Sequence, residues 1–242
     1  NRVDFSVIFN LMNYMWQELD YVPWMSANRA FTFLTPRLSG SAIFPYYQEY
    51  IRRIVAPLFN HLGVQWIANE PRLDRFSRTI AMNLACRHQL PECLARTTAE
   101  LTANVNEGRR IEPEYRASIY CNGLRNGSTL LFLSIHNRLL RTEGDQGERN
   151  NLIDGMSCTQ NSDLLSMFLN IAITPGFVFT NAERTRILTS PATQGEPSLY
   201  TMIEFIETKF NAINAEGPTF LPSMLNSISN NIASEELYAR YM

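Results

Sequence analysis

The chain has 242 residues, 45% of them hydrophobic and 18% charged, with a formal net charge of −2. This composition can fill a large buried core, and it excludes a disordered polyelectrolyte and a nucleic-acid-binding protein with a concentrated basic surface. No apolar run approaches the roughly 18 residues that a membrane span needs. The segment Asn1–Asp4 lacks the pattern of a signal peptide, so we expect any export signal to lie outside this chain.

The first part of the chain shows apolar residues at three- and four-residue spacing, which is typical of amphipathic helices. This spacing predicts helices over Phe5–Glu18, Ser26–Leu38 and Ile43–Leu62. Aromatic residues are frequent in the same region. Because they fall at helical spacing, we expect them to pack in the core rather than to form a binding surface.

The middle of the chain contains three similar units, each an apolar helix, a polar turn and a second apolar helix. The first helices are predicted at Arg75–Cys86, Glu114–Cys121 and Arg149–Cys158. The second helices are predicted at Cys93–Val105, Thr129–Leu140 and Asp163–Ile173. Cysteines recur near the ends of the first helices at almost constant spacing, and such a period indicates stacked helical hairpins.

Further helices are predicted downstream at Asn181–Thr189, Ser198–Ile213, Leu221–Ile232 and Glu235–Tyr241, with a breaker run over Ser190–Pro197. Asp74 is predicted to cap one helix, and Thr180 with Glu183 forms the pattern of a capping box. No run alternates in the manner of a strand. The predicted fold is therefore all-α: a single solenoid domain over residues 1–242, made of stacked antiparallel helix pairs in a HEAT- or armadillo-like bowl.

The cysteines and one sequon point to the secretory pathway. Cys86, Cys93, Cys121 and Cys158 lack the paired CxxC spacing of a zinc site, and their even number allows two disulfides with three connectivities. Asn126 begins an Asn-Gly-Ser sequon. We therefore expect oxidised cysteines and a glycan on Asn126.

No catalytic or metal-binding constellation is found in the sequence. The histidines His61, His88 and His136 are not followed by glutamate, so the HExxH zinc helix is absent. Nucleophile elbows, P-loops and dinucleotide fingerprints are also absent. We predict no catalytic residue and no metal ligand in this segment, and we assign the three histidines structural roles.

Several motifs together resemble the C-terminal domain of aminopeptidase N and its relatives. They are Tyr21-Val22-Pro23-Trp24 as a loop between helices, a helix ending at Pro57-Leu58, the short loop from Cys86 to Pro91-Glu92-Cys93, the helix start Ile111–Arg116, and Tyr120-Cys121 followed one repeat later by Cys158. The resemblance covers essentially the whole chain, and the cysteine framework is its most specific part.

This resemblance implies disulfides Cys86–Cys93 and Cys121–Cys158. It also implies that the parent protein is a zinc exopeptidase that removes N-terminal residues from peptides, with the zinc and its ligands in a domain N-terminal to this chain. The segment itself would be a helical cap that closes the active-site chamber. The implied location is the extracellular face of the plasma membrane or the secretory lumen, with a GPI anchor in the insect branch. The implied partners are peptide substrates, the catalytic domain, a second copy in a homodimer and, in insects, bacterial toxins.

Two other functions are compatible with the residues alone. One is a receptor or interaction solenoid that docks a toxin or another protein without any enzymatic role. The other is an intracellular HEAT-type adaptor with reduced cysteines. Thiol titration distinguishes the adaptor from the other two, and the sequence upstream of Asn1 distinguishes the enzyme domain from the receptor.

Overall fold

A computed structural model describes residues 5–176 and 179–242, and this part of the chain is helical and contains no strand. Residues 1–4, on which the expectation about a signal peptide depended, lie outside it. The α-helices are α1 (Phe5–Met12), α2 (Tyr21–Leu38), α3 (Phe44–Leu62), α4 (Arg72–Arg87), α5 (Pro91–Glu107), α6 (Pro113–Arg125), α7 (Thr129–Arg141), α8 (Gln146–Met156), α9 (Ser162–Ala172), α10 (Asn181–Thr189), α11 (Glu196–Glu216), α12 (Phe220–Ser229) and α13 (Glu235–Tyr241). Short 3₁₀ helices η1 (Asn13–Gln17) and η2 (Ser190–Gln194) lie between them.

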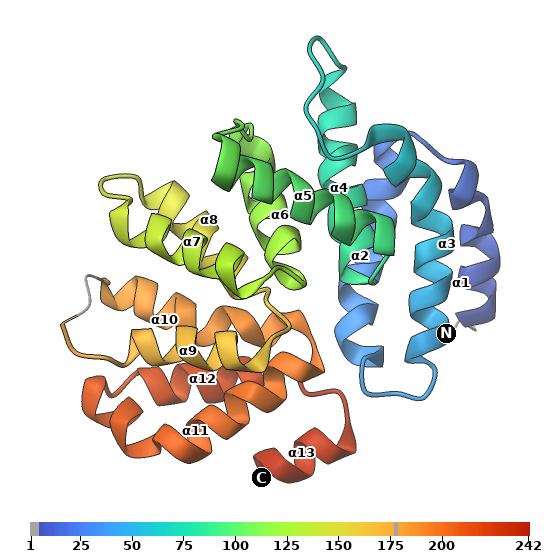
Figure 1. Ribbon diagram of the computed structural model, residues 1–242. Helices are drawn as coiled ribbons and strands as arrows, with labels where there is room; N and C mark the ends of the chain where they lie inside the picture. The colour runs from blue at the N-terminus through green and yellow to red at the C-terminus, as the bar shows by residue number, and fades with distance from the viewer. Residues whose placement is uncertain (1–4, 177–178) are drawn as a thin grey trace.

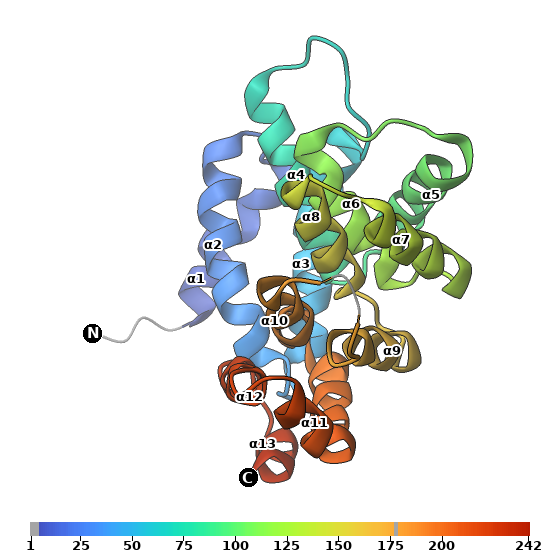
Figure 2. The same cartoon turned by 90° about the vertical axis from the view of Figure 1, so that its left-hand side faces the viewer.

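The helices form two stacked rows, which is the arrangement of an α-solenoid (Figures 1 and 2). One row is α2, α4, α6, α8, α10 and α12, each packed on the next. The other row contains α3, α5, α7, α9 and α11, each packed on the following or preceding helix of the first row. The all-α fold predicted from the sequence is confirmed, and the packing of the helices is consistent with a solenoid.

The superhelix curls until its two ends meet. A side-chain carbon added at Gly40, in the turn between α2 and α3, would lie 2.5 Å from Cβ of Ser234, just before α13. Since only glycine allows this approach, Gly40 lets the first hairpin touch the last. The row of even-numbered helices lies on the inside of this curve.

Amphipathic patterning explains why the elements are helical. In α3, residues at helical spacing such as Ile51, Val55, Leu58 and Leu62 are buried and face the next helix. Side-chain caps fix several helix starts: the side chains of Ser128, Asp145, Asn161, Thr180 and Ser234 accept hydrogen bonds from the backbone of the first turn. The capping box predicted for Thr180 and Glu183 is confirmed.

Three expectations about the first helices were wrong. The run Tyr21–Trp24 is not a loop: it forms the first turn of α2, because Pro23 tolerates a helix start and the buried Trp24 donates its indole N–H to the carbonyl of Glu18. The predicted helix Phe5–Glu18 tightens into η1 after Met12. Helix α3 does not end at Pro57-Leu58, as the resemblance implied, but continues to Leu62, the end that the apolar spacing predicted.

Two further boundaries differ from the prediction. Asp74 is not a cap, because α4 already begins at Arg72 and leaves Asp74 in its first turn, where a negative charge suits the helix dipole. The breaker run over Ser190–Pro197 contains η2 and the start of α11. A proline is tolerated in the first turn of each, where no backbone N–H needs an intrahelical acceptor.

The period of the cysteines in the sequence suggested that they occupy equivalent positions on successive helices. In the structure their positions differ. Cys86 lies one residue before the end of α4, Cys121 lies four residues before the end of α6, and Cys158 lies beyond the last residue of α8. Helix α6 continues past Cys121 because Asn122 and Leu124 are buried and extend its packed face. The repeat is therefore a repeat of hairpins and not of cysteine positions.

The prediction that the N-terminal aromatics pack in the core holds for some of them. Trp24, Phe31 and Phe59 are fully buried, and Tyr47 is almost so. Other aromatics of the same region remain largely exposed: Tyr14, Trp16, Phe33, Tyr46 and Trp66.

Candidate functional site: the concave cavity

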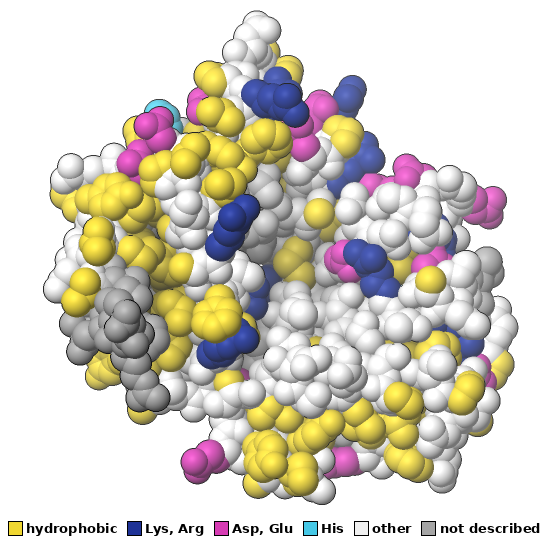
Figure 3. Space-filling view, turned by 180° about the vertical axis from the view of Figure 1, so that it is seen from behind, with side chains coloured by type: hydrophobic (Ala, Val, Ile, Leu, Met, Phe, Trp, Pro, Cys, Tyr) yellow, Lys and Arg dark blue, Asp and Glu magenta, His cyan; other side chains and the backbone are white. Residues whose placement is uncertain are grey.

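The inner row of helices encloses a cavity of about 530 Å³. Most of the residues that line it are of polar or charged type, and they come from α2, α4, α6, α8, the residues after α8, α10 and η2: Asn28, Phe31, Thr32, Thr35, Asn83, Leu84, Arg87, Ala117, Ser118, Cys121, Asn122, Arg125, Asp154, Cys158, Arg186, Ser190, Thr193 and Gln194. The face of the molecule opposite to that in Figure 1 is hollowed at its centre, with basic side chains along the hollow (Figure 3). A second cavity of about 390 Å³ shares Arg87 and Arg125 with the first.

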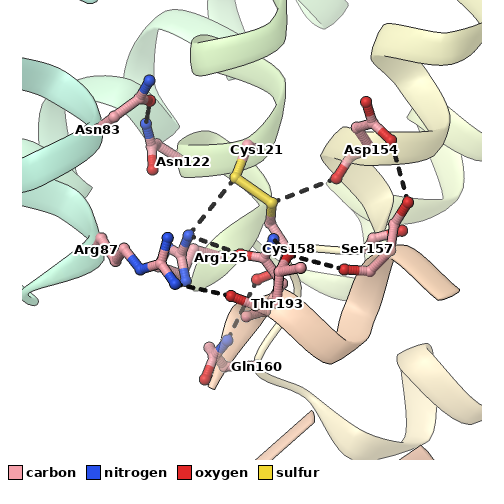
Figure 4. The surroundings of a disulfide bond; sticks show 12 residues. Asn83, Arg87, Cys121, Asn122, Arg125, Asp154, Ser157, Cys158, Gln160 and Thr193 are labelled. Carbon is pink, nitrogen blue, oxygen red and sulfur yellow. Dashed lines mark hydrogen bonds between the residues drawn. A yellow bond between two sulfur atoms is a disulfide. The ribbon is translucent and has the colours of Figure 1, made fainter. Parts of the chain in front are cut away.

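Arg87 and Arg125 are the last residues of two neighbouring inner helices, α4 and α6. Arg87 donates from Nη2 to the carbonyl of Thr193 at 2.8 Å. Arg125, only 4% exposed, donates from Nη2 to Oε1 of Gln194 at 3.2 Å and to Sγ of Cys121 at 3.5 Å. Both side chains thus tie the N-terminal hairpins to η2 across the concave face (Figure 4).

On the other wall, Arg186 of α10 is paired with a carboxylate. Its Nε and Nη2 donate to the two oxygens of Asp154 on α8, at 2.6 and 2.5 Å. Ser190 also donates to Asp154. These hydrogen bonds to the carboxylate raise the pKa of Arg186. The pair links α8 to α10, and Arg186 neutralises the charge of Asp154.

The structure joins Cys121 to Cys158 and Cys86 to Cys93, the pairing that the resemblance implies. The Cys121–Cys158 disulfide lies in the cavity wall next to Arg125, and its Cα atoms are 5.1 Å apart (Figure 4). It connects α6 to the residues that follow α8. The Cys86–Cys93 disulfide is fully buried and spans the turn between α4 and α5.

The remaining residues singled out in the sequence lie apart from one another. Asn126 follows the last residue of α6, is exposed, and lies at the rim of the second cavity. His61 is exposed in the last turn of α3, and His136 is half-buried on α7. His88 is fully buried, with Nε2 3.3 Å from the hydroxyl of Thr35 and its ring edge-on to Tyr47. Burial, with the nearby positive charge of Arg87, lowers the pKa of His88 to about 3.

Within residues 5–176 and 179–242, no three His, Cys, Asp or Glu side chains are grouped closely enough to hold a metal ion. The residues described here therefore do not fit a zinc site. In the same part of the chain, no helix combines the length and the hydropathy that crossing a membrane requires.

Sequence reasoning missed the residues that line the cavity. Asn83 lies shortly before the Cys86 loop and Asn122 directly follows Tyr120-Cys121, two motifs that carried the family resemblance, but the hydrogen bond from Asn122 to Asn83 on the cavity wall did not follow from them. The composition offered one signal for these residues: Lys209 is the only lysine in the sequence, and every other Lys or Arg position is arginine. Two of these arginines each end an inner helix, which is the feature that brings them together.

These features define an α-solenoid with a polar concave face, and comparison with known families identifies the class. A family model described as "ERAP1-like C-terminal domain" matches residues 1–241. The chain belongs to this family.

Individual relatives narrow the class further. The chain is 30% identical to aminopeptidase N of Plutella xylostella over 97% of its own length, which is 25% of that protein. It is 25% identical to aminopeptidase N of Bos taurus, over 79% of the chain and 20% of that protein. It is 22% identical to the membrane alanyl aminopeptidase of Heliothis virescens, over 84% of the chain and 20% of that protein. The chain thus spans about a quarter or less of the length of these relatives.

Proposed function

We propose that this chain is the non-catalytic C-terminal domain of a zinc metallo-aminopeptidase that removes N-terminal residues from peptides. In this proposal its concave face covers the chamber in which the peptide lies. The observation that carries the proposal is the polar cavity of about 530 Å³ on the inner row of helices, in a chain of the ERAP1-like C-terminal family. A curved polar wall can enclose an extended peptide without binding one sequence tightly, because it offers many weak polar contacts.

The zinc and the catalytic residues would belong to a domain N-terminal to this chain. The relatives support this division, because the matching part is only 25% of the Plutella xylostella protein. Their names also favour an aminopeptidase over the receptor solenoid considered from the sequence.

The proposed location is the extracellular face of the plasma membrane or the lumen of the secretory pathway. Two disulfides support an oxidising compartment. Asn126 is exposed, so a glycan on it meets no steric barrier from the folded domain. We expect the protein made in a eukaryotic secretory pathway to lose mass on amidase treatment, and the Asn126→Gln variant to show no such loss. An unchanged mass for the unsubstituted protein would exclude a glycan at this position.

The chamber role can be tested with a bulky side chain in the cavity. Thr32 lines the cavity and is exposed, so Thr32→Trp in the full-length protein narrows the space without disturbing the core. Leu130→Trp is the matched control, because Leu130 is 78% exposed and is not among the residues that line either cavity. We expect Thr32→Trp to slow the hydrolysis of peptides of about ten residues by roughly tenfold, a loss of about 1.4 kcal/mol in transition-state binding.

Hydrolysis of a single-residue aminoacyl amide should be unchanged in both variants, since this substrate does not reach the concave wall. Equal rates for Thr32→Trp and Leu130→Trp on the long peptide would contradict the chamber role. A full-length protein without aminopeptidase activity would contradict the proposed function itself.

A further inference from the structure

The concave face contains two arginines whose charges have no carboxylate partner among the described residues. No carboxylate forms an ion pair with Arg87 or Arg125, whereas Arg186 in the same cavity is held by Asp154. Glu196 lines the second cavity together with the two arginines; within the described residues it forms no ion pair with either of them, and its Oε1 is buried without a hydrogen-bond partner.

Most N–H groups of the two guanidiniums also have no acceptor among the described residues. A guanidinium carries five N–H donors. Within the described residues, Arg87 uses one nitrogen, Nη2, and Arg125 donates from Nη2 to one amide oxygen and one sulfur. Nε of Arg125 is buried and has no hydrogen-bond partner. Such a donor costs free energy unless a ligand or solvent satisfies it.

The two positive charges act on one another. Burial, together with the positive charge of Arg87, lowers the pKa of Arg125 to about 10. Burial also lowers the pKa of Arg87. Both groups nevertheless remain charged at neutral pH, so the repulsion between them persists in the folded protein.

A purely structural role accounts for part of this arrangement. Each arginine is the last residue of its helix, where the partial negative charge of the helix C-terminus favours a cation. The helix terminus, however, offers carbonyl oxygens and not a group that fits between two guanidiniums. It therefore does not explain the buried, unpartnered Nε of Arg125 or the pairing of two cations in one cavity.

From these observations we propose that Arg87 and Arg125 together form a binding site for a carboxylate on the concave face of the domain. A carboxylate has two oxygens that match the parallel N–H groups of a guanidinium, and one anion between two cations removes their repulsion. The wall next to the site is neutral and polar, with Gln194 and Thr193 from η2. A carboxylate bound here would link α4 and α6 to η2 and stiffen the closed curve of the solenoid. The ligand is either a small free carboxylate or the carboxylate of a peptide, and only the second source depends on the proposed function.

The test is thermal unfolding of the complete 242-residue chain in about 100 mM sodium salt, with acetate replacing chloride at constant ionic strength. For a dissociation constant near 10 mM, linkage predicts that acetate raises Tm by about 3 °C or more. Arg125→Gln and Arg87→Gln should each abolish the rise. Arg141→Gln, which changes an exposed arginine on the outer helix α7, should retain it. Arg87 is only half-buried, so Arg87→Gln disturbs the fold less than Arg125→Gln. It provides the test if Arg125→Gln does not fold.

A second arm distinguishes the two sources of the carboxylate. An N-acetylated alanine tripeptide with a free C-terminus and the same tripeptide as the amide are each added at about 10 mM in chloride. A rise in Tm with the acid alone, lost in Arg87→Gln, identifies a peptide carboxylate as the preferred ligand; an acetate effect without a peptide effect identifies a small free carboxylate.

The proposal is overturned if neither acetate nor the acid tripeptide raises Tm, if the amide acts as strongly as the acid, or if the arginine variants respond like the unsubstituted chain. None of these readouts requires enzymatic activity, so a failure of the proposed function leaves them intact.

Discussion

Arg78 on α4 and Arg125 on α6 are both buried arginines of neighbouring inner helices, but their guanidinium groups have different partners. Arg78 is 1% exposed, and its guanidinium contacts the carboxylate of Glu70 at 2.6 Å, the hydroxyl of Tyr115 at 2.9 Å and the carbonyl of Leu62 at 3.0 Å. Arg125 is 4% exposed, and among the described residues its guanidinium donates only to Oε1 of Gln194 and to Sγ of Cys121.

The difference separates an arginine that builds the fold from one that is available to a ligand. The charge of Arg78 is neutralised within the protein. Its partners lie at the end of α3, on the α3–α4 connection and on α6, so Arg78 joins these parts of the chain to α4. The charge of Arg125 is left without a carboxylate at the wall of a cavity. Burial of a charge is costly in both cases, but only the first is compensated by groups of the described chain.

The largest effect is expected at Arg78. Arg78→Met should lower the free energy of unfolding by about 3–5 kcal/mol, because it removes the close cation of the buried carboxylate of Glu70 and leaves only Arg75, 3.9 Å away. Urea denaturation followed by circular dichroism measures this loss. Arg53→Met is the control: the side chain of Arg53 is 78% exposed and pairs with Glu49 on the helix surface, so its loss should cost less than about 1 kcal/mol. Equal losses for the two variants would show that the Arg78 cluster is not structural.

The buried ion pair of Glu183 with Arg149 makes the stability of the folded chain depend on pH. Burial favours the protonated form of Glu183, but hydrogen bonds from Arg149, the backbone N–H of Thr180 and Gln146 outweigh it and hold the pKa of Glu183 at about 2. Because the folded-state pKa lies below the ordinary value of 4.5, the stabilisation is fully present above pH 4.5 and is lost as the pH falls through 2. It amounts to about 3 kcal/mol.

Glu183→Gln should therefore be less stable than the unsubstituted chain at pH 7, with a gap that closes between about pH 4.5 and 2. Glu107→Gln, at an exposed ion pair with Arg109, is the control and should change stability by less than about 1 kcal/mol at any pH. A gap for Glu183→Gln that stays constant down to pH 2 would contradict the assignment.

A smaller difference in the free energy of unfolding is expected between the two disulfides. The Cys121–Cys158 disulfide next to Arg125 spans 37 residues, whereas Cys86–Cys93 spans 7. In the chain-entropy model the longer loop contributes roughly 4 kcal/mol and the shorter one roughly 2.5. Cys121→Ser should then lower the free energy of unfolding by about 1–2 kcal/mol more than Cys93→Ser. Chemical denaturation of both variants measures the difference, and non-reducing peptide mapping verifies the pairing. Recovery of a peptide joining Cys86 to Cys121 would refute the arrangement of repeats.

The smallest effect is expected at Arg125 itself. Arg125→Met, measured without carboxylates in the buffer, should change the free energy of unfolding by no more than about 1 kcal/mol in either direction. The variant loses two long hydrogen bonds to neutral acceptors, Gln194 and Cys121, but no longer buries an uncompensated charge. A loss as large as that of Arg78→Met would mean that the two arginines have the same structural role, and the comparison would fail.

The sequence alone determined the class of this protein. Apolar spacing of three and four residues and local caps such as Thr180 with Glu183 depend on neighbours within one helical turn, so they can be identified in a linear sequence. The period of the hairpins and the order of the cysteines also survive in the sequence, and they carried the resemblance to aminopeptidase N relatives. Helix ends were less well predicted: α6 runs to Arg125 because its burial against neighbouring helices, and not its own pattern, decides where it stops.

Only the tertiary structure decided which arginines are compensated. In the sequence, Arg78 and Arg125 are two of many arginines, each with apolar residues close by. Glu70 lies only 8 residues from Arg78, but other partners come from distant parts of the chain: Tyr115 is 37 residues from Arg78, Gln194 is 69 residues from Arg125, and Thr193 is 106 residues from Arg87. The electrostatic state of a buried group depends on every charge and dipole within a few ångströms, and the curl of the solenoid determines which ones those are.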